Sequence, residues 1–245
     1  MGSRRQPFLD HEGDVPNRKN DMADSTGTLN ACAHFTRRGR APAPDHDANH
    51  AARESRVVAE QRRLIQWAEE NDRLKTRHRS LPEFARGGEH LVFYRQSNQR
   101  YYKATLAERQ KGYGIALGSF SRGATPSEYL DRQALHNRIF EDDIRLEYVL
   151  ENRGFPVIVI SQPGVKGSSP TQAAIDAMML AKDFEAIAPG AYYDCEEGLL
   201  IFDLFPRNAI LTEDGDVFPI DPVIQRIDAD FAEFLRAQPH TINLI

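Results

Sequence analysis

The C-terminal third of the chain alternates short apolar runs with turns. The run GLLIF ends at Asp203, the runs AILT and VF flank the turn EDGD, and the returning run ends at Asp221. Apolar runs of this length bounded by turn residues are typical of strands, and the flanked turn predicts a hairpin. We therefore expect Asp203, Asn208 and Asp221 to converge at one edge of the strands.

The segment DLFPRN, residues 203–208, has two interpretations. Asp and Asn around a proline suit an ordinary turn capped by its own side chains. Alternatively, carboxylates brought together need a cation between them, and Asn208 with Asp221 supplies the oxygen ligands that Mg²⁺ prefers. Asp203 would then orient or deprotonate a hydroxyl group. Phosphoryl transfer requires mainly such positioning and charge neutralisation.

A cation for phosphates is expected from the segment GGEHLVFYRQSNQRYYKAT, residues 87–105. It predicts a β-hairpin with a turn at residues 97–99, entered through Gly87 and Gly88. Lys103 lies on the second strand, and the two glycines would let the backbone approach a phosphate. The alternative is a solvated lysine on a half-buried strand.

Between these segments the sequence predicts helices and strands in mixed order. Thr125, Pro126 and Glu128 form a capping box with proline at the first helical position, so a helix should run to about Phe140. Strands are expected at about 144–150 and 156–160, a loop or ragged strand at 106–124, and a further helix from Pro170. The predicted fold class is α+β.

The N-terminal part contrasts with this pattern. Residues 1–52 are polar with almost no apolar periodicity, which predicts disorder or a linker. From about Arg53 to Leu74, apolar residues recur on one helical face, which predicts an amphipathic helix (Val57, Leu64, Trp67, Ala68, Leu74). We expect this lead-in helix, within residues 53–80, to pack on the following domain; binding a partner is the alternative.

Composition narrows the functional classes. The 245 residues are 40% hydrophobic with a net charge of −5, which favours neither nucleic acid nor a membrane as partner. The two cysteines predict no disulfide framework, and no apolar signal segment is visible at the N-terminus. We therefore expect a cytoplasmic protein.

The motif DLFPRN resembles the protein-kinase catalytic loop, whose pattern is Asp-Leu-x-Pro-x-Asn. The thirteen-residue spacing from Asn208 to Asp221 is also similar to the kinase spacing between these two metal ligands. The wider text of residues 55–228 resembles the small kinase-like domain found in polyvalent proteins of phages and conjugative elements. The resemblance implies a minimal two-lobed kinase-like fold at residues 81–245, with an N-lobe at about 85–160 and a truncated C-lobe at about 165–245.

The resemblance also implies roles. Lys103 would bind phosphates of ATP, Asp203 would be the catalytic acid, and Asn208 and Asp221 would hold Mg²⁺. Glu128 would be the helix partner of Lys103, although the capping box alone explains this glutamate. In the linker at residues 160–164, the backbone groups of Ser161 and Gln162 would meet adenine.

Departures from the kinase pattern leave the acceptor open. Ile201-Phe202 replaces the usual His-Arg, Pro222-Val223 replaces Phe-Gly, and only 24 residues follow Asp221. We expect an ATP- and Mg²⁺-dependent phosphotransferase acting on an unknown protein or small-molecule hydroxyl. The alternatives are a nucleotide-binding pseudokinase used as an interaction module, and a non-enzymatic scaffold in which DLFPRN is only a turn.

Overall fold

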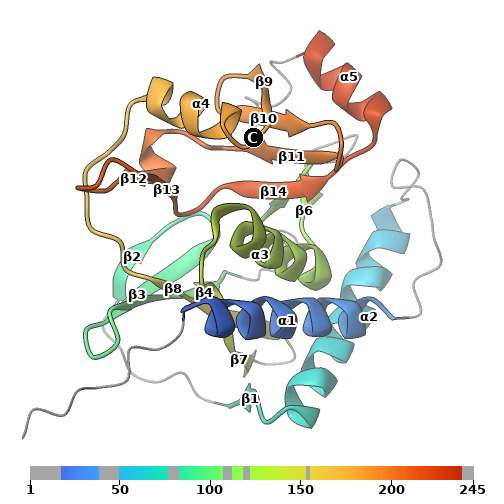
Figure 1. Ribbon diagram of the computed structural model, residues 1–245. Coiled ribbons are helices and arrows are strands. Elements are labelled where there is room, and N and C mark those ends of the chain that lie inside the picture. Colours follow the sequence, from blue (N-terminus) through green and yellow to red (C-terminus); the bar gives the residue numbers. More distant parts are fainter. Residues whose placement is uncertain are drawn as a thin grey trace, which may run out of the picture.

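The computed structural model of the chain is a mixed α+β protein, as the sequence predicts. In the described part of the chain, a six-stranded sheet and helices α1 to α3 form one half, and a smaller sheet with α4 and α5 forms the other. Figure 1 shows how the two halves are arranged. The structure describes residues 18–38, 50–76, 83–106, 112–117, 122–152 and 155–238.

The larger sheet carries the first set of predicted strands. Its order is β1-β7-β8-β4-β3-β2. The predicted hairpin is β3-β4, and Lys103 in β4 pairs with Val92 on one side and Ile160 on the other. The strands span Leu74–Lys75 (β1), Glu83–Arg86 (β2), His90–Arg95 (β3), Arg100–Thr105 (β4), Arg145–Asn152 (β7) and Phe155–Pro163 (β8).

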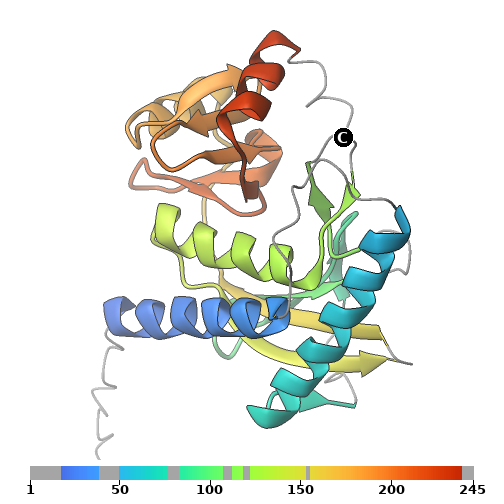
Figure 2. The ribbon, with the colours of Figure 1, turned by 90° about the vertical axis from the view of Figure 1, so that its right-hand side faces the viewer.

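Helix α3, Pro126–Phe140, lies between the two sheets (Figures 1 and 2). Its predicted capping box is present, because the Thr125 side chain accepts from the Glu128 N–H and the Glu128 carboxylate accepts from the Thr125 N–H. The helix ends at Glu141, which has left-handed backbone angles. Both ends of the predicted helix are confirmed.

The prediction of disorder for residues 1–52 is wrong for residues 18–37, which form helix α1 (Arg18–Arg37). Leu29, Cys32 and Ala33 are fully or almost fully buried, in one cluster with Leu130 and Ala134 of α3. Figure 2 shows α1 running alongside α3. The other buried residues of this helix include Ser25 and Thr36, which are polar, so the sequence shows only a weak apolar stripe. Residues 1–17 and 39–49 lie outside the described part of the chain.

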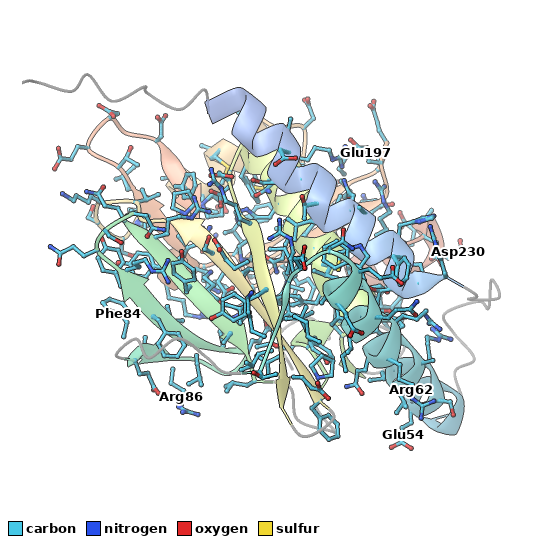
Figure 3. All side chains as sticks on the ribbon, turned by 90° about the horizontal axis from the view of Figure 1, so that it is seen from below. Glu54, Arg62, Phe84, Arg86, Glu197 and Asp230 are labelled. Atoms are coloured by element: carbon cyan, nitrogen blue, oxygen red, sulfur yellow. The ribbon has the colours of Figure 1, made fainter. Side chains whose placement is uncertain are left out.

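The predicted lead-in helix is α2, His50–Glu70. Leu64, Trp67 and Ala68 are buried in the same core cluster as α1 and α3, so this helix packs on its own domain. Glu54 and Arg62 project from its outer side (Figure 3). The helix ends earlier than predicted, because the chain turns at Asp72, which has a φ of 55°, and Leu74 lies in β1.

The second half is built on a four-stranded sheet in the order β14-β11-β10-β9. The helix predicted from Pro170 is α4, Gln172–Leu180, and the predicted strand GLLIF is β11, Leu199–Phe202. Strand β14 and helix α5 were not predicted. The remaining elements span Glu185–Ala188 (β9), Ala191–Asp194 (β10), Val223–Arg226 (β14) and Ala229–Ala237 (α5).

Two small hairpins complete the fold. The predicted hairpin around EDGD is β12 (Ala209–Leu211) paired with β13 (Val217–Pro219). The predicted loop at 106–124 includes the short strands β5 (Ile115–Ala116) and β6 (Arg122–Gly123), which pair with each other. Residues 107–111 and 118–121 of that loop lie outside the described residues.

Candidate active site

Lys103 connects the two halves of the molecule. Its side chain leaves the middle of the larger sheet, and Nζ donates a hydrogen bond of 2.6 Å to the backbone oxygen of Ile220. Nζ also lies 3.6 Å from Oδ1 of Asp221, and only 11% of the lysine side chain is exposed. The structure thus brings together the predicted phosphate-binding lysine and one predicted metal ligand, which are 118 residues apart.

Asp221 follows strand β13 and precedes a proline, whose ring restricts the backbone there. Besides Lys103, the ring of buried His90 approaches it, with Nδ1 3.9 Å from Oδ1 of Asp221. Burial raises the pKa of Asp221, but the charges of Lys103 and Arg132 and the hydrogen bond from Lys103 outweigh burial and hold that pKa well below its usual range. Asp221 is therefore ionised across the whole range in which the protein would work.

Asp203 directly follows strand β11 and has a left-handed backbone, with a φ of 57°. A non-glycine residue in that region is uncommon and is frequent at functional turns. Asn208 fixes the turn, because its Nδ2 donates to the backbone oxygen of Asp203 at 2.6 Å and to Oδ2 at 2.9 Å. The short helix η2, Pro206–Asn208, lies between them. DLFPRN is thus a turn capped by its own side chains, as one interpretation predicts.

Arg207 is a contact of Asp203 that the sequence did not indicate. Its guanidinium forms an ion pair with Oδ1 of Asp203 and lies over the ring of Phe205, 4.7 Å from the ring centroid. Burial raises the pKa of Asp203, Arg207 and Asn208 oppose the rise, and the negative charges of Asp221 and Glu89 add to it. The net result is an Asp203 pKa above the ordinary value, which makes this carboxylate a better proton acceptor.

The donor set at Asn208 and Asp221 fits a hard cation. The amide nitrogen of Asn208 is used by Asp203, which leaves the amide oxygen as the available ligand atom. Asp221 adds an ionised carboxylate. In the described part of the chain, no group of three or more His, Cys, Asp or Glu residues is arranged to hold a metal. The remaining ligands of Mg²⁺ would have to be phosphate oxygens and water, as is usual for this ion.

Glu128 is not brought to Lys103. Its carboxylate closes the capping box with Thr125, and the preceding residue, Ser127, donates its N–H to Glu60 of α2 at 3.0 Å. The first turn of α3 therefore faces α2. The carboxylate partner of Lys103 is Asp221.

Gly87 and Gly88 form the turn between β2 and β3, which Gly87 closes by donating its N–H to the backbone oxygen of His90 at 2.9 Å. A Cβ at Gly88 would meet no atom within 4 Å, so the outer side of the turn is open. The next residue, Glu89, forms an ion pair of 2.5 Å with Arg132 of α3. This pair was not predicted, since an arginine on a helix gives no local signal of its partner.

Ser161 and Gln162 lie inside β8, which continues through Pro163. Both are buried, and β8 pairs with β4 and β7, so their backbone groups lie within the sheet. Their side chains serve the fold: Ser161 accepts from Arg100 at 2.8 Å, and Gln162 donates to Asp142 at 2.7 Å. The structure therefore does not place either residue in a linker. The chain leaves the sheet after Pro163.

The comparison with protein families agrees with this geometry. Residues 58–228, more than half of the chain, match the family described as serine/threonine/tyrosine kinase found in polyvalent proteins. No curated protein and no solved structure matches the chain. Among the described residues, no helix is long and apolar enough to cross a membrane. The matched region includes the Lys103 strand, the Asp203 turn and Asp221, and the chain belongs to the family of serine/threonine/tyrosine kinases found in polyvalent proteins.

Proposed function

We propose that this chain transfers the γ-phosphoryl group of ATP, with Mg²⁺, to a hydroxyl acceptor. The two halves would be the lobes of a reduced kinase-like fold, with the nucleotide bound between Lys103 and the Asp203 turn. The observation that supports this most is the contact of Lys103 with Asp221, because it sets a phosphate-binding cation beside a metal-binding carboxylate from the other half.

Each residue has a distinct task in this proposal. Lys103 would bind phosphate oxygens, and Asn208 and Asp221 would hold Mg²⁺, which when bound supplies charge neutralisation on the phosphates. Asp203 would orient the acceptor hydroxyl and accept its proton. The hydrogen bonds from Asn208 support the last role, since they fix the carboxylate before an acceptor arrives.

The raised pKa of Asp203 supports the same assignment. A carboxylate with more affinity for a proton takes it more readily from a hydroxyl group in the transition state. Arg207 limits this rise in pKa, because its ion pair favours the ionised form of Asp203 before a substrate binds.

The test is phosphate transfer from ATP by the wild-type chain and by Asp203→Asn, with serine-, threonine- and tyrosine-containing peptides and small alcohols as acceptors. Asp203→Asn should lower transfer by about 10²-fold or more while MgATP still raises the melting temperature. Asp221→Ala should lose most of that rise. Unchanged transfer in Asp203→Asn would contradict the proposal.

A second candidate is a protein that binds nucleotide without turnover. The Arg207 ion pair favours it, because this cation occupies the carboxylate that an acceptor hydroxyl would have to reach. Arg207→Ala distinguishes the two functions. If the ion pair is the reason for a lack of turnover, wild type would bind MgATP and transfer nothing, and Arg207→Ala would gain transfer. A wild-type chain that already transfers phosphate would contradict the second candidate.

A further inference from the structure

Helix α3 contacts Glu89 and His90, the two residues that follow the glycine turn. Glu89 contacts Arg132, with Nη2 2.5 Å and Nη1 3.4 Å from its two carboxylate oxygens. His90 contacts Tyr129, with Nε2 3.0 Å from the phenol oxygen. Tyr129 and Arg132 are three positions apart on one helical face, and the guanidinium lies over the Tyr129 ring at 5.2 Å from its centroid. One turn of α3 therefore contacts both Glu89 and His90.

The carboxylate of Glu89 is a junction of three elements. Besides Arg132, it accepts the backbone N–H of Ile115 in β5 at 2.8 Å. Gly114 has a φ of 89°, and a Cβ there would lie 2.6 Å from the Glu89 carboxylate. The helix, the β5 segment and the turn at residues 87–90 thus converge on one carboxylate, which has no room to move toward β5.

Burial decides how strong this connection is. Only 4% of the Arg132 side chain and 17% of the Glu89 side chain are exposed. A buried, bidentate arginine–carboxylate pair is directional, and removal of one partner leaves a buried charge without compensation. The turn therefore has a fixed position relative to α3.

The same turn is linked to the rest of the site. His90, whose backbone oxygen closes the turn, is also the residue whose ring approaches Asp221. It lies opposite Thr105, two residues along β4 from Lys103. A displacement of the turn would therefore alter the surroundings of both Lys103 and Asp221.

We propose that Arg132 is a positioning residue, which through Glu89 holds the Gly87–Gly88 turn against the phosphates of a bound nucleotide. The helix carries the cation and the turn carries the acid, so α3 sets the position of the turn, while Lys103 is set by Asp221. The proposal rests on the nucleotide binding proposed above. It assigns to this ion pair a role in phosphate affinity and none in recognition of the base.

The decisive variant is Glu89→Met with Arg132→Met in the full chain. Replacing both buried charges by apolar side chains of similar length is often neutral for stability, so this protein should fold, with a melting temperature lowered mainly because the Ile115 N–H loses its acceptor. Its dissociation constant for MgATP should rise about tenfold or more, because the turn is no longer fixed. Its dissociation constant for adenosine, which has no phosphate, should stay within about twofold.

Two further proteins complete the test, a milder change of Arg132 and a control at an exposed ion pair. Arg132→Lys keeps the buried charge but loses the bidentate geometry, so an intermediate loss of MgATP affinity is expected even if the double variant does not fold. The control is Arg138→Ala with Glu197→Ala, which removes an exposed ion pair, with contacts of 2.7 Å, between the same helix and the turn before β11, and should change neither constant.

The outcomes separate the two proposals. Wild-type MgATP affinity in a folded double variant and in Arg132→Lys would overturn the positioning role and leave the proposed function standing. Equal losses of ATP and adenosine affinity would also overturn it, since they would indicate a general structural effect. A wild-type chain that binds no MgATP would overturn the proposed function and the positioning role with it.

Discussion

The ammonium group of Lys103 lies 3.6 Å from the carboxylate of Asp221, across the junction of the two halves. Asp221 and Glu89 both raise the pKa of Asp203, so this site brings several negative charges close together. A cation at Lys103 therefore holds together a site that is otherwise rich in carboxylates. The predictions below test this site and the fold that builds it.

Lys103→Met should abolish the stabilisation by nucleotide. The wild-type chain at a MgATP concentration 100 times its dissociation constant should gain about 2.7 kcal/mol in free energy of unfolding, and the variant almost nothing. Urea unfolding with and without MgATP measures this. Lys75→Met, an exposed lysine on the edge strand β1, is the control and should keep the full gain. Equal gains in both variants would contradict a role for Lys103.

His136→Leu should weaken the dependence of the free energy of unfolding on pH below about pH 6.5. Burial lowers the pKa of His136 to about 3, so below its ordinary value of 6.5 the unfolded chain binds a proton that the folded chain does not. Each such histidine lowers the free energy of unfolding by about 1.4 kcal/mol per pH unit as the pH falls from about 6.5 toward the pKa of the folded state.

The free energy of unfolding between pH 4 and 7 measures this effect. His90 acts in the same direction, with a pKa that burial lowers to about 4, and Asp142 acts in the opposite one, because burial raises its pKa to about 6. The contributions of His90 and Asp142 to the pH dependence of stability remain in the His136→Leu variant. At pH 7 the stability of His136→Leu should be close to that of wild type, because Nδ1 lies 3.3 Å from Oδ2 of Asp142 but outside hydrogen-bond geometry. His34→Gln, an exposed position on α1, should leave the slope unchanged.

Gly167→Ala should destabilise the connection between the two halves. A Cβ there would lie 2.1 Å from the backbone oxygen of Leu211, next to the bridge between Ser168 and Leu211. Backbone must move to admit it, so we expect a loss of about 1–3 kcal/mol in chemical unfolding. Gly88→Ala is the matched control, because its Cβ would meet no atom within 4 Å. Equal stability of the two variants would contradict the packing described here.

Leu29→Ala tests whether α1 is part of the folded core. Leu29 is fully buried against α3, so its truncation should cost about 2–5 kcal/mol. Leu180→Ala removes the same atoms from a side chain that is 72% exposed and should change stability by less than about 0.5 kcal/mol. If Leu29→Ala behaves like Leu180→Ala, α1 contributes little to the fold.

Local signals in the sequence predicted much of the fold. The capping box at Thr125 and Glu128, the hairpin around residues 213–216 and the hairpin that carries Lys103 all depend on neighbours in the chain, and the structure contains each of them. Helix α1 was missed because its buried stripe is narrow and its other positions are polar. Burial against α3 stabilises it, and that contact has no signature within residues 18–37.

The candidate site also combines features that local sequence predicts with contacts that depend on tertiary packing. The sequence by itself determined that Asp203, Asn208 and Asp221 stand at strand ends, because apolar runs and turn residues fix where strands stop. Only the tertiary structure decided that Lys103 pairs with Asp221 and that Glu89 and Arg132 join the turn to α3. These partners are 43 to 118 residues apart, so their pairing depends on how helix and sheets pack, which no short stretch of sequence encodes.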